Sequence, residues 1–188
     1  MSSNLTFKAT PIEGLFIIER DLIKDNRGFF FRLFAGSELV SIGLKKSIAH
    51  INFSHTNDLH STRGLHFQYP PHTETKIVTC LKGEVFDVAV DLRNDSPTFL
   101  NWFGINLSPE NNRSFFIPDG FAHGFQVLKK DSELIYLHTN EYVKESEGGL
   151  HVLDPLIGIK WPHEPTKLSE RDKGFVFLNN NFKGIEIL

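Results

Sequence analysis

Cysteine is nearly absent from this sequence, because its 188 residues include only Cys80. A lone cysteine has no partner within the chain, which excludes an internal disulfide framework and favours a reducing compartment. No window approaches the ~20 consecutive apolar residues of a membrane span. Residues 1–10 lack the basic and apolar regions of a secretory signal. We therefore expect a cytoplasmic protein that has no membrane partner.

An excess of positive charge is also lacking. Lys and Arg total 20 against 23 Asp and Glu, which gives a net charge of -3. This balance does not provide the broad basic face of a nucleic-acid-binding protein, and we expect no nucleic-acid partner. The glycine-rich loops that hold NAD or P-loop nucleotides are missing, as is the Gly-x-Ser-x-Gly turn of serine hydrolases. The sequence therefore predicts no bound cofactor and gives little support to nucleophilic catalysis.

Phenylalanine, in contrast, is abundant, with 18 residues. So many bulky rings need a wide interior, which a β-barrel or β-sandwich provides more readily than a small helical bundle. The chain has no internal repeat, low-complexity tract or long linker, and its length suits a single domain spanning residues 1–188.

Short runs rich in Val, Ile, Phe and Thr, separated by turn signals, predict a series of β-strands. The expected strands are 15–19, 28–34, 48–54, 75–81, 85–92, 99–107, 115–117, 121–128 and 134–139. Apolar residues fill most of 85–91, so Asp87 and Asp91 are expected to face a polar interior or a turn. Only residues 36–42 and the tail after Leu168 look helical. The predicted fold is all-β, a jelly roll or related double-sheet β-barrel with short peripheral helices.

Two segments carry candidate chemistry. Residues 62–68 place Arg63 close to His66, a pair suited to binding an anionic substrate and moving protons near neutral pH. The alternative is a half-buried structural histidine beside a surface arginine. Residues 117–125 contain a Pro-x-Gly-x-x-His spacing that ends at His123 and resembles the second motif of cupin-type barrels.

In metal-binding cupins that histidine is a metal ligand, together with an earlier His-x-His pair. Here Gln68 stands where the second histidine of the pair belongs, and a carboxamide is a poor ligand for transition metals. We therefore predict no metal. Lys76, Tyr136 and Asp172, taken singly, are more often structural than catalytic. The other histidines outside these motifs are expected to be mostly exposed: His55, His60, His72, His138, His151 and His163.

Taken together, the motifs resemble the dTDP-4-dehydrorhamnose 3,5-epimerase family, whose members act on nucleotide-linked 4-keto-6-deoxy sugars. The resemblance covers nearly the whole chain, through blocks at 25–30, 63–68, 76–78, 83–91, 96–99, 117–125, 159–162 and 168–169. It implies a cupin-like jelly roll without metal or cofactor and a nucleotide-diphosphate sugar as substrate. It also implies a homodimer in which the N-terminal region of one subunit completes the site of the other.

The resemblance further implies roles for individual residues. His66 matches the general base, paired with Asp172, while Tyr136 matches the general acid and Lys76 a lysine near the sugar ketone. Residues matching groups around the substrate are Arg27, Arg63, His123 and Tyr142. These types suit the chemistry, because epimerisation removes a proton beside a ketone and returns one from the opposite face of the ring.

Two positions depart from the family pattern near the nucleotide. Arg32 replaces the usual Glu, and His50, two residues before Asn52, replaces the usual Gln. A carboxylate can accept a hydrogen bond from the ring N–H of thymine, whereas a guanidinium only donates and would suit the ring acceptor of cytosine. The nucleotide is therefore dTDP or CDP, unless Arg32 points elsewhere or pairs with a diphosphate oxygen.

The sequence leaves open whether carbon 3, carbon 5 or both are inverted. Two other classes of function compete with the epimerase. The Pro-x-Gly-x-x-His motif favours a metal-dependent cupin oxygenase, which Gln68 weakens. A non-catalytic jelly roll that binds sugar nucleotides is the third interpretation, and the presence of both a base and an acid disfavours it.

Overall fold

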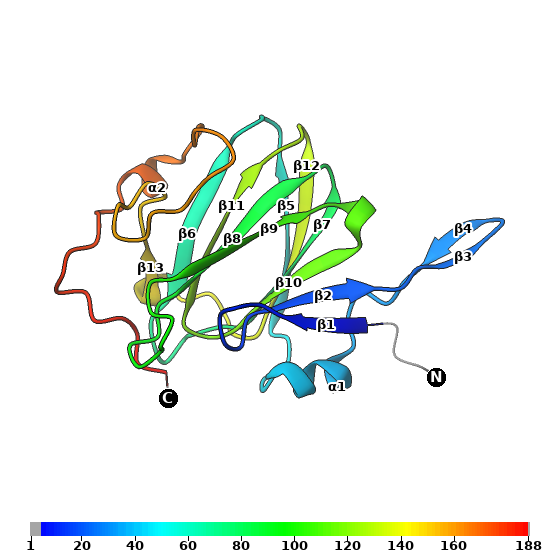
Figure 1. Ribbon diagram of the computed structural model, residues 1–188, viewed down its shortest axis with the longest axis horizontal. Helices are drawn as coiled ribbons and strands as arrows, with labels where there is room; N and C mark the ends of the chain where they lie inside the picture. Colours follow the sequence, from blue (N-terminus) through cyan, green and yellow to red (C-terminus); the bar gives the residue numbers. More distant parts are fainter. Residues whose placement is uncertain (1–4, 188) are drawn as a thin grey trace.

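Two antiparallel sheets face each other in the computed structural model, which describes residues 5–187 (Figure 1). From edge to edge, the six-stranded sheet consists of β1 (Leu5–Ala9), β2 (Phe16–Arg20), β10 (Arg113–Ile117), β7 (Lys76–Lys82), β12 (Ser132–His138) and β5 (His50–Thr56). The five-stranded sheet likewise consists of β13 (Glu147–Gly149), β6 (Thr62–Gln68), β11 (Phe121–Val127), β8 (Val85–Asp91) and β9 (Trp102–Leu107). This arrangement confirms the predicted all-β, double-sheet fold.

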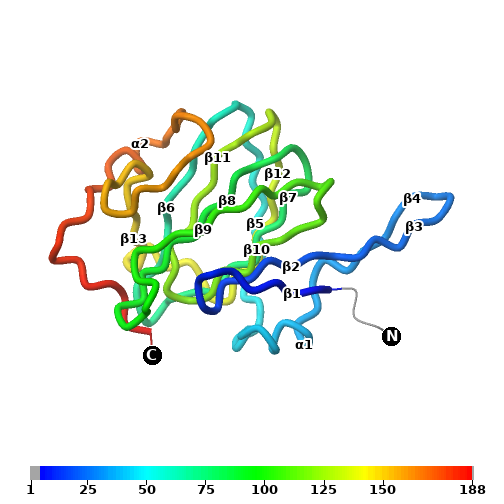
Figure 2. Tube along the Cα trace, in the orientation of Figure 1, coloured from blue at the N-terminus to red at the C-terminus, as the bar shows by residue number. Residues whose placement is uncertain are grey.

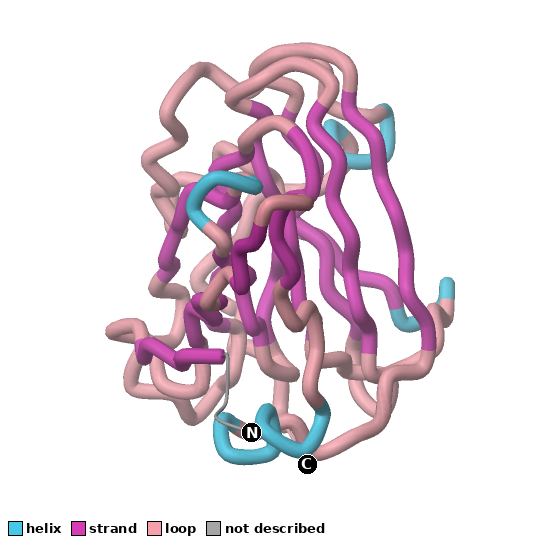
Figure 3. The backbone as a smooth tube through the Cα atoms, turned by 90° about the vertical axis from the view of Figure 1, so that its right-hand side faces the viewer, coloured by secondary structure: helices cyan, strands magenta, loops and turns pink. Residues whose placement is uncertain are grey.

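Helices are short and peripheral within residues 5–187. They are α1 (Gly36–Leu39), α2 (Glu170–Lys173) and the 3-10 turns η1 (Val40–Ile42), η2 (Pro109–Asn111) and η3 (Lys144–Ser146). The helix expected at 36–42 is therefore present as α1 and η1, at the lower end of the body in Figure 3. The helical expectation for the tail is wrong beyond Lys173. Gly174 ends α2, and the tail then runs along the outside of the body (Figure 2).

Most of the predicted strands are confirmed, but two boundaries are wrong. The strand expected at 28–34 ends at Phe30 as β4 (Gly28–Phe30), which pairs only with β3 (Ile23–Asp25). This hairpin projects from the body in Figure 1, so it has no neighbouring sheet to extend it. The strand expected at 99–107 begins instead at Trp102, because residues 96–101 form turns. The short strands β1, β3 and β13 were not predicted, and β6 was also missing from the expected strands.

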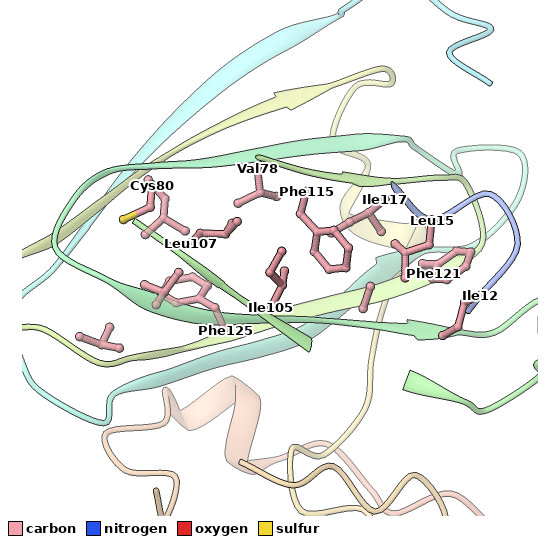
Figure 4. Close-up of a cluster of buried hydrophobic side chains, with 14 residues drawn as sticks. Ile12, Leu15, Val78, Cys80, Ile105, Leu107, Phe115, Ile117, Phe121 and Phe125 are labelled. Carbon is pink, nitrogen blue, oxygen red and sulfur yellow. The ribbon is translucent and has the colours of Figure 1, made fainter. Parts of the chain in front are cut away.

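The main core fills the space between the two sheets (Figure 4). Alternation along each strand sends successive side chains to opposite faces, so Phe115 points into this core while Phe116 points to the outer face. On that outer face of the six-stranded sheet, Leu39 and Ile42 of the helical segment cover the strands. The C-terminal segment covers the outer face of the five-stranded sheet with Ile185. Short segments of chain thus cover part of each outer face, while Ile51 and Phe53 on the edge strand β5 stay exposed.

Two acids on β8 behave as the sequence predicts. Asp91 is fully buried and accepts hydrogen bonds from Arg93, Ser96 and Thr98, so it organises the turn that follows the strand. Asp87, also fully buried, faces the interior. The expectation that aromatic rings fill the interior holds only in part, since Phe29 and Phe30 on the β3–β4 hairpin are 64% and 62% exposed. Within residues 5–187, no helix is long and apolar enough to cross a membrane.

Candidate active site

A cavity of about 380 Å³ opens between the two sheets, and polar side chains from both sheets line it. The five-stranded sheet contributes Arg63, His66 and His123. The six-stranded sheet contributes side chains from three neighbouring strands: Asn52, Ser54, Lys76, Tyr136 and His138. Groups that are far apart in the sequence therefore meet at one place, and this cavity is the candidate active site.

His66 on β6 is paired with a buried carboxylate. Its Nε2 lies 2.7 Å from Oδ1 of Asp172, whose side chain is only 3% exposed. Asp172 is in the first turn of α2, where its backbone N–H donates to the hydroxyl of Ser169 at 3.1 Å. That N-cap fixes the start of the helix and aims the carboxylate at the sheet.

Gly64 explains why the motif reads Arg-Gly-x-His. Its φ is +112°, and a Cβ there would lie 2.7 Å from the carbonyl oxygen of His123 on β11. Only glycine tolerates both the positive φ and this close approach of the two strands. The Gly64 N–H also donates to Oδ2 of Asp172 at 3.3 Å, so both carboxylate oxygens are held by β6.

The pair is neutral imidazole beside carboxylate. Burial, together with the positive charges of Arg171 and Lys76, lowers the pKa of His66 more than Asp172 raises it. Burial also raises the pKa of Asp172, but hydrogen bonds from His66 and Gly64 outweigh that effect and leave it below the usual value. With the Nε2 proton directed at Asp172, the lone pair is on Nδ1, which makes His66 a base.

Arg171 is a site residue that the motifs did not reveal. Its Nη2 lies 2.8 Å from Nε2 of His66, and its Nη1 lies 2.7 Å from Oε1 of Glu147. A guanidinium only donates, so Arg171 can hydrogen-bond to Nε2 only in the tautomer that carries its proton on Nδ1, whereas Asp172 is paired with the Nε2–H tautomer. Arg171 also lines a second cleft of about 530 Å³, together with Arg63, His66 and Lys167. The two cavities share Arg63, His66 and Arg171, and in the second the cations lie beside the carboxylates of Asp58 and Asp172.

Tyr136 lies on the opposite sheet from His66. Its hydroxyl is 2.9 Å from the hydroxyl of Ser54, and burial raises its pKa, so the phenol keeps its proton and can act as an acid. The ring packs edge-on to His123, with centroids 6.1 Å apart. Nε2 of His123 in turn lies 2.9 Å from Oδ1 of Asp87, a carboxyl whose pKa burial raises.

Lys76 lies at the start of β7 and is 7% exposed. Its Nζ donates to the backbone carbonyl of His66 at 3.4 Å and pairs with Oε1 of Glu74 at 3.2 Å. A buried ammonium in this position can stabilise negative charge that develops on a bound substrate.

The remaining predicted binding residues divide into two groups. Asn52 and Arg63 line the cavity, and Nε of Arg63 donates to the hydroxyl of Thr56 at 3.1 Å. His50 does not line it, but its ring stacks on that of His138 with centroids 4.5 Å apart. The expectation that His138 is merely exposed is wrong, since its side chain is 12% exposed and belongs to the cavity wall.

Three predicted residues lie away from the cavity of their own chain. Arg27, whose side chain is 84% exposed, pairs with Asp25 on the projecting hairpin. Arg32 places Nη1 3.3 Å from Oε1 of Glu38. The Tyr142 hydroxyl donates to Oε2 of Glu147 at 3.2 Å, next to the Arg171 contact described above.

The donor set does not fit a cupin metal centre. The Gln68 amide is engaged by backbone groups, donating to the carbonyls of His72 and Glu141 and accepting from the N–H of Val143. In residues 5–187, no group of three or more His, Cys, Asp or Glu side chains is arranged to hold a metal. A thiol nucleophile also finds no support, because burial raises the pKa of Cys80 to about 12.

Comparison with known proteins agrees with this site. The family model for dTDP-4-dehydrorhamnose 3,5-epimerase matches residues 9–180. The dTDP-4-dehydrorhamnose 3,5-epimerase of Shigella flexneri is 41% identical over 164 residues, which is 87% of this chain and 90% of that protein. The 3,5-epimerase of Legionella pneumophila, crystallised with dTDP-4-keto-L-rhamnose, has a TM-score of 0.90 at 40% identity, covering 98% of this chain and 99% of that chain. A 3'-monoepimerase of Streptomyces bikiniensis, crystallised with dTDP-quinovose, has a TM-score of 0.82 at 30% identity, covering 89% and 85%.

Fold and site together define a cupin-like jelly-roll isomerase, with an acid–base cavity between its two sheets. The chain belongs to the dTDP-4-dehydrorhamnose 3,5-epimerase family. This confirms the resemblance seen in the sequence motifs.

The Asp172 carboxylate gives the first prediction. In Asp172→Asn the charge that stabilises a protonated His66 is lost, so kcat is expected to fall by about 10³–10⁴-fold, the scale known for the Asp of a Ser-His-Asp triad. Because Asp172 raises the pKa of His66, its removal also moves the acidic limb of the pH–rate profile to lower pH. Initial epimerase rates across the acidic and neutral range measure both effects. Glu170→Gln, which changes an exposed carboxylate of the same helix, is the control. An unchanged kcat, or an acidic limb shifted to higher pH, would contradict the assigned pairing.

Proposed function

We propose that this chain is a cofactor-free epimerase of a dTDP-linked 4-keto-6-deoxyhexose. One observation supports the proposal most strongly. The neutral imidazole of His66, paired with the buried carboxylate of Asp172, lines the same cavity as the protonated phenol of Tyr136. His66 and Tyr136 come from opposite sheets. A base and an acid on facing walls are what inversion of a carbon beside a ketone requires.

The chemistry follows from these positions. His66 removes the proton from the carbon next to the ketone, and the electron pair of that C–H bond moves into an enolate. The Lys76 ammonium stabilises the enolate oxygen, a contribution worth roughly 3–4 kcal/mol for one such donor in other enzymes. Tyr136 then donates its proton to the opposite face of the carbon. Proton exchange with water returns His66 and Tyr136 to their starting states, so the net reaction is an isomerisation.

Three cations of the second cleft support a diphosphate site. Arg63, Lys167 and Arg171 line this cleft, and Arg63 and Arg171 also line the inner cavity. Arginine forks match phosphate oxygens well. We therefore assign the sugar to the inner cavity and the nucleotide diphosphate to the cleft.

The nucleotide proposed is dTDP. The Arg32 ion pair with Glu38 supports the alternative in which Arg32 points elsewhere, and this removes the main reason to favour CDP. The Legionella and Streptomyces relatives are both bound to dTDP sugars. Inversion at both carbons is proposed because the relatives named as 3,5-epimerases are 33–44% identical to this chain, above the 30% of the 3'-monoepimerase.

A homodimer is part of the proposal. The β3–β4 hairpin projects from the body and carries exposed Phe29 and Phe30 together with Arg27 (Figure 1). The edge strand β5 exposes Ile51 and Phe53, at 58% and 61%. Clustered apolar side chains of this kind mark protein contacts. We propose that the hairpin of one subunit docks on the other and brings Arg27 to its diphosphate.

The single-domain and cytoplasmic assignments remain predictions from the sequence.

Incubation with dTDP-4-keto-6-deoxyglucose in D₂O, followed by NMR, tests the function. The expected result is deuterium at carbons 3 and 5, since each inversion replaces a carbon-bound proton with one from solvent. His66→Ala is expected to lose ~10³-fold or more in rate, the upper part of what acid–base catalysis contributes. Label at one carbon alone would make the chain a mono-epimerase. Absence of label with both dTDP and CDP substrates would favour a binding protein instead.

The dimer gives a separate prediction. The double variant Phe29→Ser/Phe30→Ser removes the exposed rings of the hairpin and is expected to shift the protein from dimer to monomer in light scattering after size exclusion. Arg27→Ala should remain dimeric but raise KM about tenfold, as expected for loss of one charged hydrogen bond to a phosphate. Val176→Ser, which removes an 81% exposed apolar side chain elsewhere, is the matched control. A wild-type monomer with full activity would contradict the shared site.

A further inference from the structure

A carboxylate outside the motifs, Glu74, lies between two site residues. Its Oε1 is 3.2 Å from Nζ of Lys76, and its Oε2 is 2.8 Å from Nδ1 of His138. The side chains of Glu74 and Lys76 are each only 9% exposed. A carboxylate buried to this degree needs partners for both oxygens, and these two contacts provide one for each.

Strand register places the imidazole where Glu74 can reach it. His138 on β12 lies opposite Lys76 on β7 and opposite His50 on β5. The stacked rings of His50 and His138, nearly parallel with an interplanar angle of 15°, hold His138 in one orientation. Its Nδ1 then faces Glu74 while the ring forms part of the cavity wall.

The charge states fit this geometry. Burial raises the pKa of Glu74, but the hydrogen bond from His138 and the charge of Lys76 outweigh it and leave the pKa below its usual value. Burial, together with the neighbouring Lys76 and His50, lowers the pKa of His138 more than Glu74 raises it. Glu74 is therefore an anion and His138 a neutral ring that donates its Nδ1 proton to the carboxylate.

The ammonium of Lys76 has three N–H donors on a flexible four-carbon stem. One is directed at Glu74 and one at the carbonyl oxygen of His66. With two donors engaged in this way, the third is left for the cavity that Lys76 lines. Without Glu74 the Lys76 ammonium would keep only its 3.4 Å contact with the carbonyl oxygen of His66. The direction of its third N–H would then no longer be fixed.

We propose that Glu74 and His138 are positioning residues for Lys76. The carboxylate fixes the ammonium so that its free donor points at the substrate ketone, and His138 fixes the carboxylate. The inference rests on the proposed function, because it assigns Lys76 to the enolate oxygen.

The chain supplies a matched control for this arrangement. Glu133, on the same strand as His138, also contacts a lysine and a histidine, Lys82 at 3.4 Å and His55 at 3.3 Å. Its side chain is 28% exposed and does not line the cavity. Glu133→Gln therefore removes the same charge from a similar trio without affecting Lys76.

The experiment compares Glu74→Gln with Glu133→Gln in the D₂O exchange assay, with kcat and KM measured separately. Glu74→Gln is expected to lower kcat by ~10–10²-fold, because a misplaced catalytic group, here the Lys76 ammonium, slows a reaction on this scale. KM should stay close to the wild-type value. Glu133→Gln should match wild type.

His138→Asn, which keeps an N–H donor near the position of Nδ1, should retain more activity than His138→Leu. The ¹⁵N NMR signals of His138 should show the Nδ1–H form in the wild type and the Nε2–H form in Glu74→Gln, because the new amide donates to Nδ1.

The outcomes separate the two proposals. If the wild type shows no exchange, the proposed function fails and this inference fails with it. If the wild type exchanges and Glu74→Gln matches it in kcat, the positioning role alone is wrong. The positioning role is also wrong if Glu74→Gln and Glu133→Gln lose kcat equally. It is likewise wrong if His138 is in the Nε2–H form in the wild type.

Discussion

The hydrogen bond between His66 and Asp172 is the interaction on which the rest of the site depends. It joins β6, in the middle of the chain, to α2, near its end, across 106 residues of sequence. A buried carboxylate without a partner would be strongly destabilising, so this contact anchors the helix as well as setting the state of the imidazole. The segment after α2 then packs over the five-stranded sheet through Leu178 and Ile185. One interaction thus serves both the fold and the chemistry.

The double-sheet architecture explains why base and acid face each other. Inward-pointing side chains of the two sheets fill most of the space between them with an apolar core, and toward the cavity the same inward positions become polar. His66 and His123 come from one sheet, while Lys76 and Tyr136 come from the other. A substrate ring held between the sheets has one of these sets on each side. The facing arrangement that the proposed inversion needs therefore follows from the double-sheet fold.

Much of this was predictable from the sequence, and the misses have physical causes. Alternating strands and turn signals predicted the two-sheet fold. The family resemblance assigned His66, Asp172, Tyr136 and Lys76 to the site, and His66, Tyr136 and Lys76 line one cavity. Glu74 and His138 were missed because their contact spans 64 residues and depends on the register of β7 and β12, which no local pattern encodes. Arg27 lies on a hairpin that projects from the body of its own chain, and only the proposed dimer would bring it to a substrate.

The central claim is that His66 removes the proton and Tyr136 returns it from the opposite face. The most direct measurement is the configuration of the sugar after Tyr136→Phe has acted on it in D₂O, read by NMR at carbons 3 and 5. The account predicts deuterium incorporation with the original configuration kept, because His66 still removes a proton and can only return a deuteron to the same face. Inversion at the wild-type rate in this variant would contradict the account.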